Sequence, residues 1–184
     1  MNVSHRLHSL VVPGVLIWIV LAGILLPQPA DASDIEVKIK TAYIYNFTKF
    51  IDWPADEGKP ASEPFRICVI GSDPIRTTLG ELTNREAKGR PIRVVRIKDL
   101  SALSSCHLLY ISRSEEPQLA QILQRLQGMQ VVTVSDILQF AQRGGMISFV
   151  TDKDRVRVQI NQRTAREAGV KLSAKLLEIA KVVQ

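Results

Sequence analysis

The chain has 184 residues, with 24 Lys and Arg against 18 Asp and Glu and a formal net charge of +6. Charged residues make up 23% of the sequence and aromatic residues 5%, a composition too apolar for a disordered chain. The length suits a single domain. The sequence contains one long apolar run, which excludes a multi-pass membrane protein.

That apolar run, residues 10–26, follows a short basic segment and precedes Ala30-Asp31-Ala32. A basic start, an apolar stretch and a small-x-small ending are typical of a secretory signal peptide, here cleaved after about Ala32. An uncleaved membrane anchor is the alternative, although the run contains Pro13 and Gly14 and is short for a span of about 20 residues. We therefore expect a signal peptide at 1–32 and an exported domain at 33–184.

Cys68 and Cys106 are the only two cysteines of the chain. In an exported protein such a pair predicts a disulfide, and a pair of buried free thiols is the alternative. His107 is the only histidine after the leader, so a catalytic thiol, a Ser-His-Asp triad or a His/Cys zinc site would lack partners. The sequence also lacks the G-x-S-x-G and glycine-rich phosphate-binding motifs. These observations predict no enzyme, no metal and no cofactor.

Apolar residues recur at spacings of three and four from Ile35 to Phe50, which predicts an amphipathic helix ended at Trp53 by Pro54. A second apolar stripe, formed by Val37, Ile44 and Ile51, runs along another face of this helix at intervals of seven residues. A helix with two apolar faces is either sandwiched in the core or used to bind a partner. The candidate partner-binding residues are Val37, Ile44, Ile51, Trp53 and Pro54.

Further along the chain, short apolar runs alternate with helical patterns. Strands are expected at 65–71, 92–97, 107–111, 130–134, 146–150 and 155–160, and helices after 73 and at 119–126, 136–142, 161–169 and 172–183. The last two strands should form a hairpin. This order predicts an α/β fold with a single domain, a mixed sheet of about six strands and helices on both faces.

Basic residues gather between positions 85 and 98. Such a concentration favours an anionic ligand, an acidic protein face or lipid headgroups, while an ordinary solvated surface is the alternative. Nucleic acid is disfavoured by export and by the scarcity of aromatic side chains for stacking. The candidate anion-binding or ligand-binding residues are Arg90, Arg93, Arg96 and Arg163.

An ordered series of motifs runs from about Glu36 to the C-terminus. It comprises A-Y-x-Y-N-F-x-K-F-x-x-W-P at 42–54, I-C-V-I-G at 67–71, G-R-P-I at 89–92, C-H-L-L-Y-I at 106–111, T-V-S-D at 133–136, G-G-M-I at 144–147 and L-S-x-K-L-L at 172–177. In their order and spacing these motifs resemble the YfiR-type periplasmic proteins.

The resemblance implies a non-enzymatic inhibitor that binds the periplasmic sensor domain of a YfiN-type membrane diguanylate cyclase and represses cyclic-di-GMP signalling. It also implies an outer-membrane partner of the YfiB type that sequesters the inhibitor, homodimers, and disulfides that make inhibition sensitive to redox state. Cys68 and Cys106 match that pairing. A periplasmic small-ligand-binding module that feeds a sensor kinase or receptor is the alternative function.

Overall fold

The computed structural model describes residues 32–153 and 155–183. The chain divides into two units, Met1–Asp31 and Ala32–Gln184, and all described elements belong to the second. The predicted signal peptide lies outside the described residues, apart from Ala32 at its expected end.

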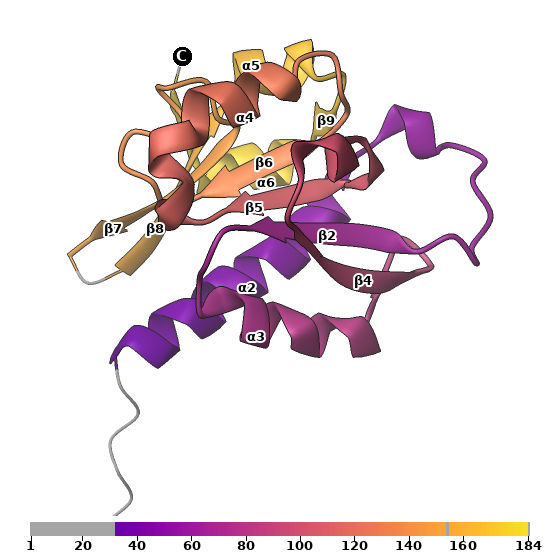
Figure 1. Cartoon of the computed structure of the whole chain (residues 1–184), viewed down its shortest axis with the longest axis horizontal. Helices are drawn as coiled ribbons and strands as arrows, with labels where there is room; N and C mark the ends of the chain where they lie inside the picture. The colour runs from indigo at the N-terminus through magenta and orange to yellow at the C-terminus, as the bar shows by residue number, and fades with distance from the viewer. Residues whose placement is uncertain (1–31, 154, 184) are drawn as a thin grey trace, which may run out of the picture. The chain divides into compact units, whose positions relative to one another are not determined.

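A mixed sheet of eight strands forms the centre of the second unit, in the order β10-β8-β7-β6-β5-β2-β4-β3 (Figure 1). Neighbouring strands are parallel except for the β7–β8 hairpin and the β3–β4 pair, which are antiparallel. The hairpin is therefore confirmed. The strands are β2 (Phe65–Ile70), β3 (Glu86–Ala87), β4 (Arg90–Ile97), β5 (Leu108–Ile111), β6 (Val132–Ser135), β7 (Ile147–Asp152), β8 (Arg155–Asn161) and β10 (Lys181–Val183).

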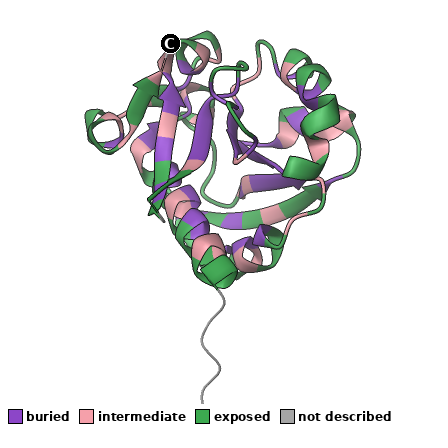
Figure 2. Cartoon of the chain, turned by 90° about the vertical axis from the view of Figure 1, so that its left-hand side faces the viewer, coloured by how far each residue is buried: buried purple, intermediate pink, exposed green. Residues whose placement is uncertain are grey.

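Helices cover both faces of this sheet, as the sequence predicts (Figure 1). Side chains of a strand alternate between the two faces, so Ile67 and Val69 of β2 join one core cluster whereas Cys68 and Ile70 join the other. The first cluster packs under α2 (Ala32–Phe50), α3 (Ile75–Gly80) and α6 (Ala174–Ile179), and the second under α4 (Leu119–Arg125). Figure 2 shows the strands coloured largely as buried and the helices exposed on their outer sides.

Shorter elements connect these layers. The helix α5 (Gln162–Glu167) follows β8, and its N-cap residue Asn161 accepts a hydrogen bond from the backbone of Thr164, as expected for a cap. A small antiparallel pair joins β1 (Ile51–Asp52) to β9 (Lys171–Leu172). The 3-10 turns are η2 (Pro54–Asp56), η3 (Glu81–Asn84), η4 (Leu100–Ser105) and η5 (Arg113–Gln118).

The helix predicted at 136–142 is wrong, because this segment forms a series of turns. The side chain of Ser135 still accepts a hydrogen bond from the backbone of Ile137, as a capping residue would. At Gln139, however, φ is +56°, a left-handed conformation that interrupts a right-handed helix. A pair of glycines follows at 144–145, so little helical sequence is available to outweigh this interruption.

The helix predicted at 172–183 is too long. Ser173 caps α6 as expected, but the helix ends at Ile179, and Lys181–Val183 forms the edge strand β10. This strand pairs in parallel with the last three residues of β8, so its backbone groups gain partners in the sheet. Two adjacent valines also favour the extended conformation over a helical one.

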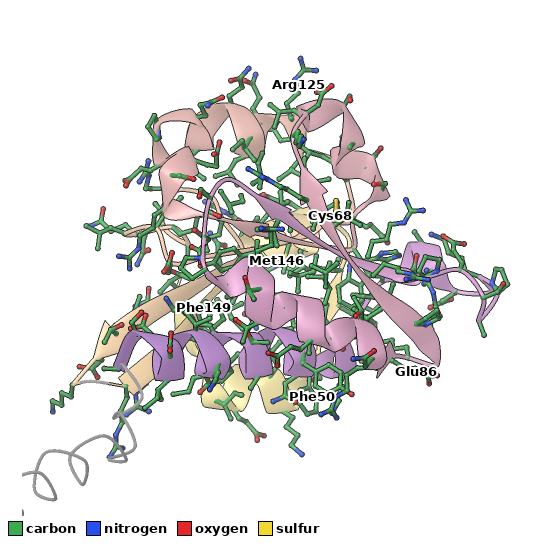
Figure 3. The ribbon with its side chains drawn as sticks, turned by 60° about the horizontal axis from the view of Figure 1, so that its bottom comes forward. Phe50, Cys68, Glu86, Arg125, Met146 and Phe149 are labelled. Carbon is green, nitrogen blue, oxygen red and sulfur yellow. A yellow bond between two sulfur atoms is a disulfide. The ribbon has the colours of Figure 1, made fainter. Side chains whose placement is uncertain are left out.

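The structure joins Cys68 and Cys106 in a disulfide, with the two Cα atoms 5.8 Å apart. Cys68 lies within β2 and Cys106 lies just before β5, and these two strands are neighbours in the sheet. Both cysteines belong to the core cluster on the α4 face. The bond thus links adjacent central strands beneath that layer (Figure 3).

Reduction of this disulfide should destabilise the fold. The cysteines are 38 residues apart in sequence. In the chain-entropy model, closing a loop of this length lowers the entropy of the unfolded chain and thereby stabilises the folded state by about 4 kcal/mol. We expect urea unfolding of the reduced protein to give a free energy of unfolding about 2–4 kcal/mol lower than that of the oxidised protein. Equal values for both forms would contradict a stabilising role for the bond.

Gly145→Ala should destabilise the protein because a Cβ atom there would lie 2.2 Å from the Phe140 ring. We expect a loss of about 1–3 kcal/mol in the free energy of unfolding, as for other overpacked sites. Gly80→Ala is the matched control, since a Cβ at this helical position meets no atom within 4 Å. It should be neutral or stabilise by up to about 1 kcal/mol. Similar losses for both variants would refute the steric account.

Candidate functional site

The first helix, α2, packs against the sheet through part of the stripe that the sequence assigns to a partner. Ile44 and Ile51 are fully buried, and Val37 is half-buried against the same core cluster. Phe47, also fully buried, has its ring centroid 6.1 Å from that of Phe149 on β7. Ile44 and Ile51 therefore cannot contact a partner in this conformation, which corrects their assignment as partner-binding residues.

Trp53 is also an internal residue. Its indole nitrogen donates a hydrogen bond to the carbonyl oxygen of His107 at 3.0 Å, and its ring packs edge-on against Phe65 with centroids 4.9 Å apart. Its side chain is buried. Pro54, the next residue, is half-buried at the start of η2. The prediction of a contact through Trp53 is wrong, since its side chain instead fixes the end of α2 to the start of β5.

The outward side of α2 carries a different pair of apolar side chains, Ile35 and Ile39, which are 49% and 40% exposed. Lys38, Ala42 and Asn46 are exposed on the same helix. These isoleucines belong to the apolar stripe that starts at Ile35, and its spacing of three and four residues can be seen in the sequence. The two stripes could not be ranked from the sequence because both are apolar.

A buried ion pair fixes which side of α2 faces the sheet. Lys40 Nζ lies 2.7 Å from Asp136 Oδ2, and it also lies 2.7 Å from the carboxylate of Glu36. Burial alone would lower the pKa of Lys40, but its hydrogen bonds to these two carboxylates raise the pKa above its ordinary value. Lys40 therefore stays charged, and its ion pair with Asp136 holds α2 to the end of β6. Sequence reasoning missed this pair because 96 residues separate its members.

A second polar cluster lies at the other end of the first helix, between Asp56, Arg90 and His107. Arg90 Nη1 lies 2.5 Å from Asp56 Oδ2, and the same oxygen lies 2.9 Å from His107 Nε2. The other guanidinium nitrogens of Arg90 donate to the carbonyl oxygens of Glu63 and Pro64. The cluster thus joins the loop after α2 to β4 and to the start of β5.

His107 is held in its neutral form. Its Nδ1 accepts a hydrogen bond from the backbone N–H of Arg66 at 2.9 Å, so the proton resides on Nε2 and is donated to Asp56. Burial lowers the pKa of His107, and the charges of Arg90 and Lys59 lower it further against the opposing effect of Asp56. For Asp56, burial would raise the pKa, but Lys59, His107 and Arg90 outweigh it and lower the pKa.

The four candidate anion-binding arginines do not form one site. Arg90 is buried with its guanidinium already paired, so it cannot accept an anionic ligand. Arg93 and Arg96 are exposed on β4 but are three residues apart on a strand, so they point to opposite faces. Arg163 lies in α5, just after β8, and four strands separate β8 from β4 in the sheet. The structure thus corrects the assignment of Arg90 as a ligand-binding residue, and it does not bring the other three arginines together.

The polar cluster and the disulfide join separate segments of the chain. The ring nitrogens of His107 are both engaged, and Cys68 and Cys106 are joined to each other. Within residues 32–153 and 155–183, no group of three or more His, Cys, Asp or Glu side chains is placed to hold a metal ion. A hollow of about 440 Å³ lies next to the cluster and is bounded by residues that include Arg66, Cys106 and His107.

The sequence profile of the YfiR/HmsC-like family matches residues 37–181. The chain is a member of the YfiR/HmsC-like family. Proteins of this family are periplasmic regulators rather than enzymes. The match includes both cysteines, His107 and most of α2. A search of curated proteins finds no match.

Two solved structures are similar to this YfiR/HmsC-like chain. A conserved domain protein from Vibrio cholerae O1 biovar El Tor strain N16961 is 12% identical, with a TM-score of 0.57 over 80% of this chain and 60% of that one. The ABC domain in complex with L-Trp from Streptococcus pneumoniae is 13% identical, with a TM-score of 0.48 over 64% of this chain and 55% of that one. The chain thus spans less than two thirds of either protein, and the Vibrio similarity concerns the fold alone.

No helix within the described part of the chain is long and apolar enough to cross a membrane. The longest, α2, has 19 residues and carries charged side chains along its length.

Stability should fall as the pH decreases from 7.5 to 5.5. Because the pKa of His107 is lowered in the folded state, the unfolded chain binds a proton first, and the stability present above the unfolded pKa of about 6.5 is lost as the pH falls through the folded pKa. We expect urea unfolding of the oxidised protein to show a loss of about 1 kcal/mol over this range.

His107→Gln supplies the control for this pH dependence. The variant should be less stable than the parent at pH 7.5, because Gln cannot reproduce both hydrogen bonds of the ring. Its free energy of unfolding should nevertheless change less between pH 7.5 and 5.5. An unaltered slope in the variant would contradict the role of His107.

Proposed function

We propose that the protein is an exported, non-enzymatic inhibitor that binds the periplasmic sensor domain of a membrane diguanylate cyclase and represses cyclic-di-GMP signalling. The match to the YfiR/HmsC-like family over residues 37–181 carries this proposal. The engagement of His107 and both cysteines in structural contacts supports a binding role over a catalytic one. Export follows from the leader pattern, with cleavage after about Ala32.

The contact surface that we propose is the outward side of α2. Ile35 and Ile39 are exposed apolar side chains on a helix whose opposite side is fixed to the sheet, so their position is rigid. A helix that is already held in place loses little backbone freedom on binding, which favours its exposed apolar side chains as contacts. Exposed Lys38 beside them can add an electrostatic contact to an acidic partner.

Inhibition requires that the protein bind the inactive state of the cyclase sensor better than the active state. A binder shifts such an equilibrium only by its difference in affinity for the two states. Sequestration by an outer-membrane lipoprotein of the YfiB type would remove the inhibitor from the cyclase. Self-association into homodimers would compete for the same apolar surface if it used α2.

The Cys68–Cys106 disulfide gives this inhibition a dependence on redox state. The bond joins neighbouring central strands, so its reduction lowers the stability of the folded domain. A smaller folded fraction leaves less inhibitor to hold the cyclase inactive.

Deleting the gene should raise cellular cyclic-di-GMP, and expression of the intact protein should restore the low level. Ile39→Glu should fail to restore it, because a carboxylate replaces an exposed apolar contact. A chain lacking residues 1–32 should also fail, since it would not leave the cytoplasm. Cyclic-di-GMP is measured by mass spectrometry of cell extracts, and the amount of each variant by immunoblot.

Val95→Glu is the matched control for Ile39→Glu. Val95 is 37% exposed on β4 and pairs with Cys68, so it lies on the sheet face opposite α2. The Val95→Glu variant should restore the low cyclic-di-GMP level. An unchanged cyclic-di-GMP level in the deletion strain would refute the proposed function. Failure of Val95→Glu alone would move the contact from α2 to β4.

A further inference from the structure

A cavity of about 500 Å³ lies between α4 and α5, away from the Asp56–Arg90–His107 cluster. Its floor is apolar and includes Leu126, Val131 and Met146, the last of which is labelled in Figure 3. Small-molecule sites are typically concavities of about 300–1,000 Å³ with an apolar lining and a few convergent polar groups. The cavity has the volume and the floor of such a site.

Two guanidinium groups border this cavity. Arg143 belongs to the turns after β6, and Arg163 belongs to α5. Arg143 also contacts Glu116 at 2.7 Å, whereas Arg163 lies 3.9 Å from Glu167, and both members of this second pair are more than two thirds exposed. Glu167 is the one acidic residue of the described lining, while Glu116, which pairs with Arg143, lies outside it, so Arg163 has the weaker of the two ion pairs.

The floor adds a hydrogen-bond donor. Thr133 is buried, and its hydroxyl oxygen accepts a hydrogen bond from the backbone N–H of Met146 at 2.9 Å. Among the described residues this is the one hydrogen bond of that hydroxyl, so its own O–H remains able to donate to a molecule in the cavity.

We propose that this cavity binds a small organic anion, a carboxylate attached to a compact apolar body. The apolar body covers the floor formed by Leu126, Val131 and Met146, and the carboxylate lies between Arg143 and Arg163. Arginine is suited to this role because its planar guanidinium pairs with a carboxylate through two parallel hydrogen bonds. This site would add a second function to partner binding, since it does not include the exposed residues of α2.

Occupancy of this site would also affect the disulfide region. Leu126 and Val131 belong to the same core cluster as Cys68 and Cys106. Residues 128, 129 and 131 border both this cavity and the hollow next to Cys106. A bound anion would therefore rest on side chains that pack around the Cys68–Cys106 disulfide.

The test is calorimetric titration of the purified, oxidised protein with 3-phenylpropionate and with its neutral analogue 3-phenylpropanamide. We expect saturable binding of the carboxylate about tenfold tighter than that of the amide, because charge-assisted hydrogen bonds are lost in the amide. Amide chemical shifts should change at residues 128–131 and 163–168. No saturable binding, equal affinity for both probes, or shifts confined to other regions would each overturn the proposal.

Arg163→Gln and Arg166→Gln form a matched pair of variants. Both arginines are exposed in α5, but only Arg163 borders the cavity. Arg163→Gln should weaken carboxylate binding about tenfold and leave amide binding unchanged, whereas Arg166→Gln should affect neither. Because both positions are on the surface, neither variant should change the thermal unfolding temperature. Equal effects of the two substitutions would overturn the assignment of Arg163.

Discussion

Ile44 and Phe47 bury their whole side chains between α2 and the sheet, and the Lys40–Asp136 ion pair fixes the same side of the helix to the end of β6. These contacts determine the rotation of α2 about its axis, and therefore which side chains remain on the surface. With this rotation Ile35 and Ile39 are exposed. The proposed partner contact thus depends on interactions made on the hidden side of the helix.

The central strands β2 and β5 receive support on both faces and at one end. The disulfide links them beneath the α4 layer, while Trp53 and the Asp56–Arg90–His107 cluster link their starts to the loop after α2. Because His107 directly follows Cys106, reduction of the bond would loosen the residue that carries the polar cluster. Redox state and pH therefore act on two adjacent residues just before β5.

The central strands could be predicted from the sequence because buried parallel strands form continuous apolar runs, as in residues 65–70. The rotation of α2 could not be predicted, since both stripes are apolar and the choice depends on Asp136, far away in sequence. The same limit applies to Arg90, whose burial depends on a carboxylate from a distant loop. The turns at 136–142 and the strand Lys181–Val183 depend on local backbone conformation and on sheet pairing, which periodicity does not record.

The most direct measurement is site-specific photo-crosslinking in intact cells, with a benzophenone amino acid introduced at position 39 on α2 or at position 95 on the opposite face of the sheet. The account predicts that position 39, and not position 95, crosslinks to a membrane protein whose cytoplasmic part contains a diguanylate cyclase domain. It is contradicted if position 39 crosslinks no such cyclase, or if the cyclase is captured from position 95 alone.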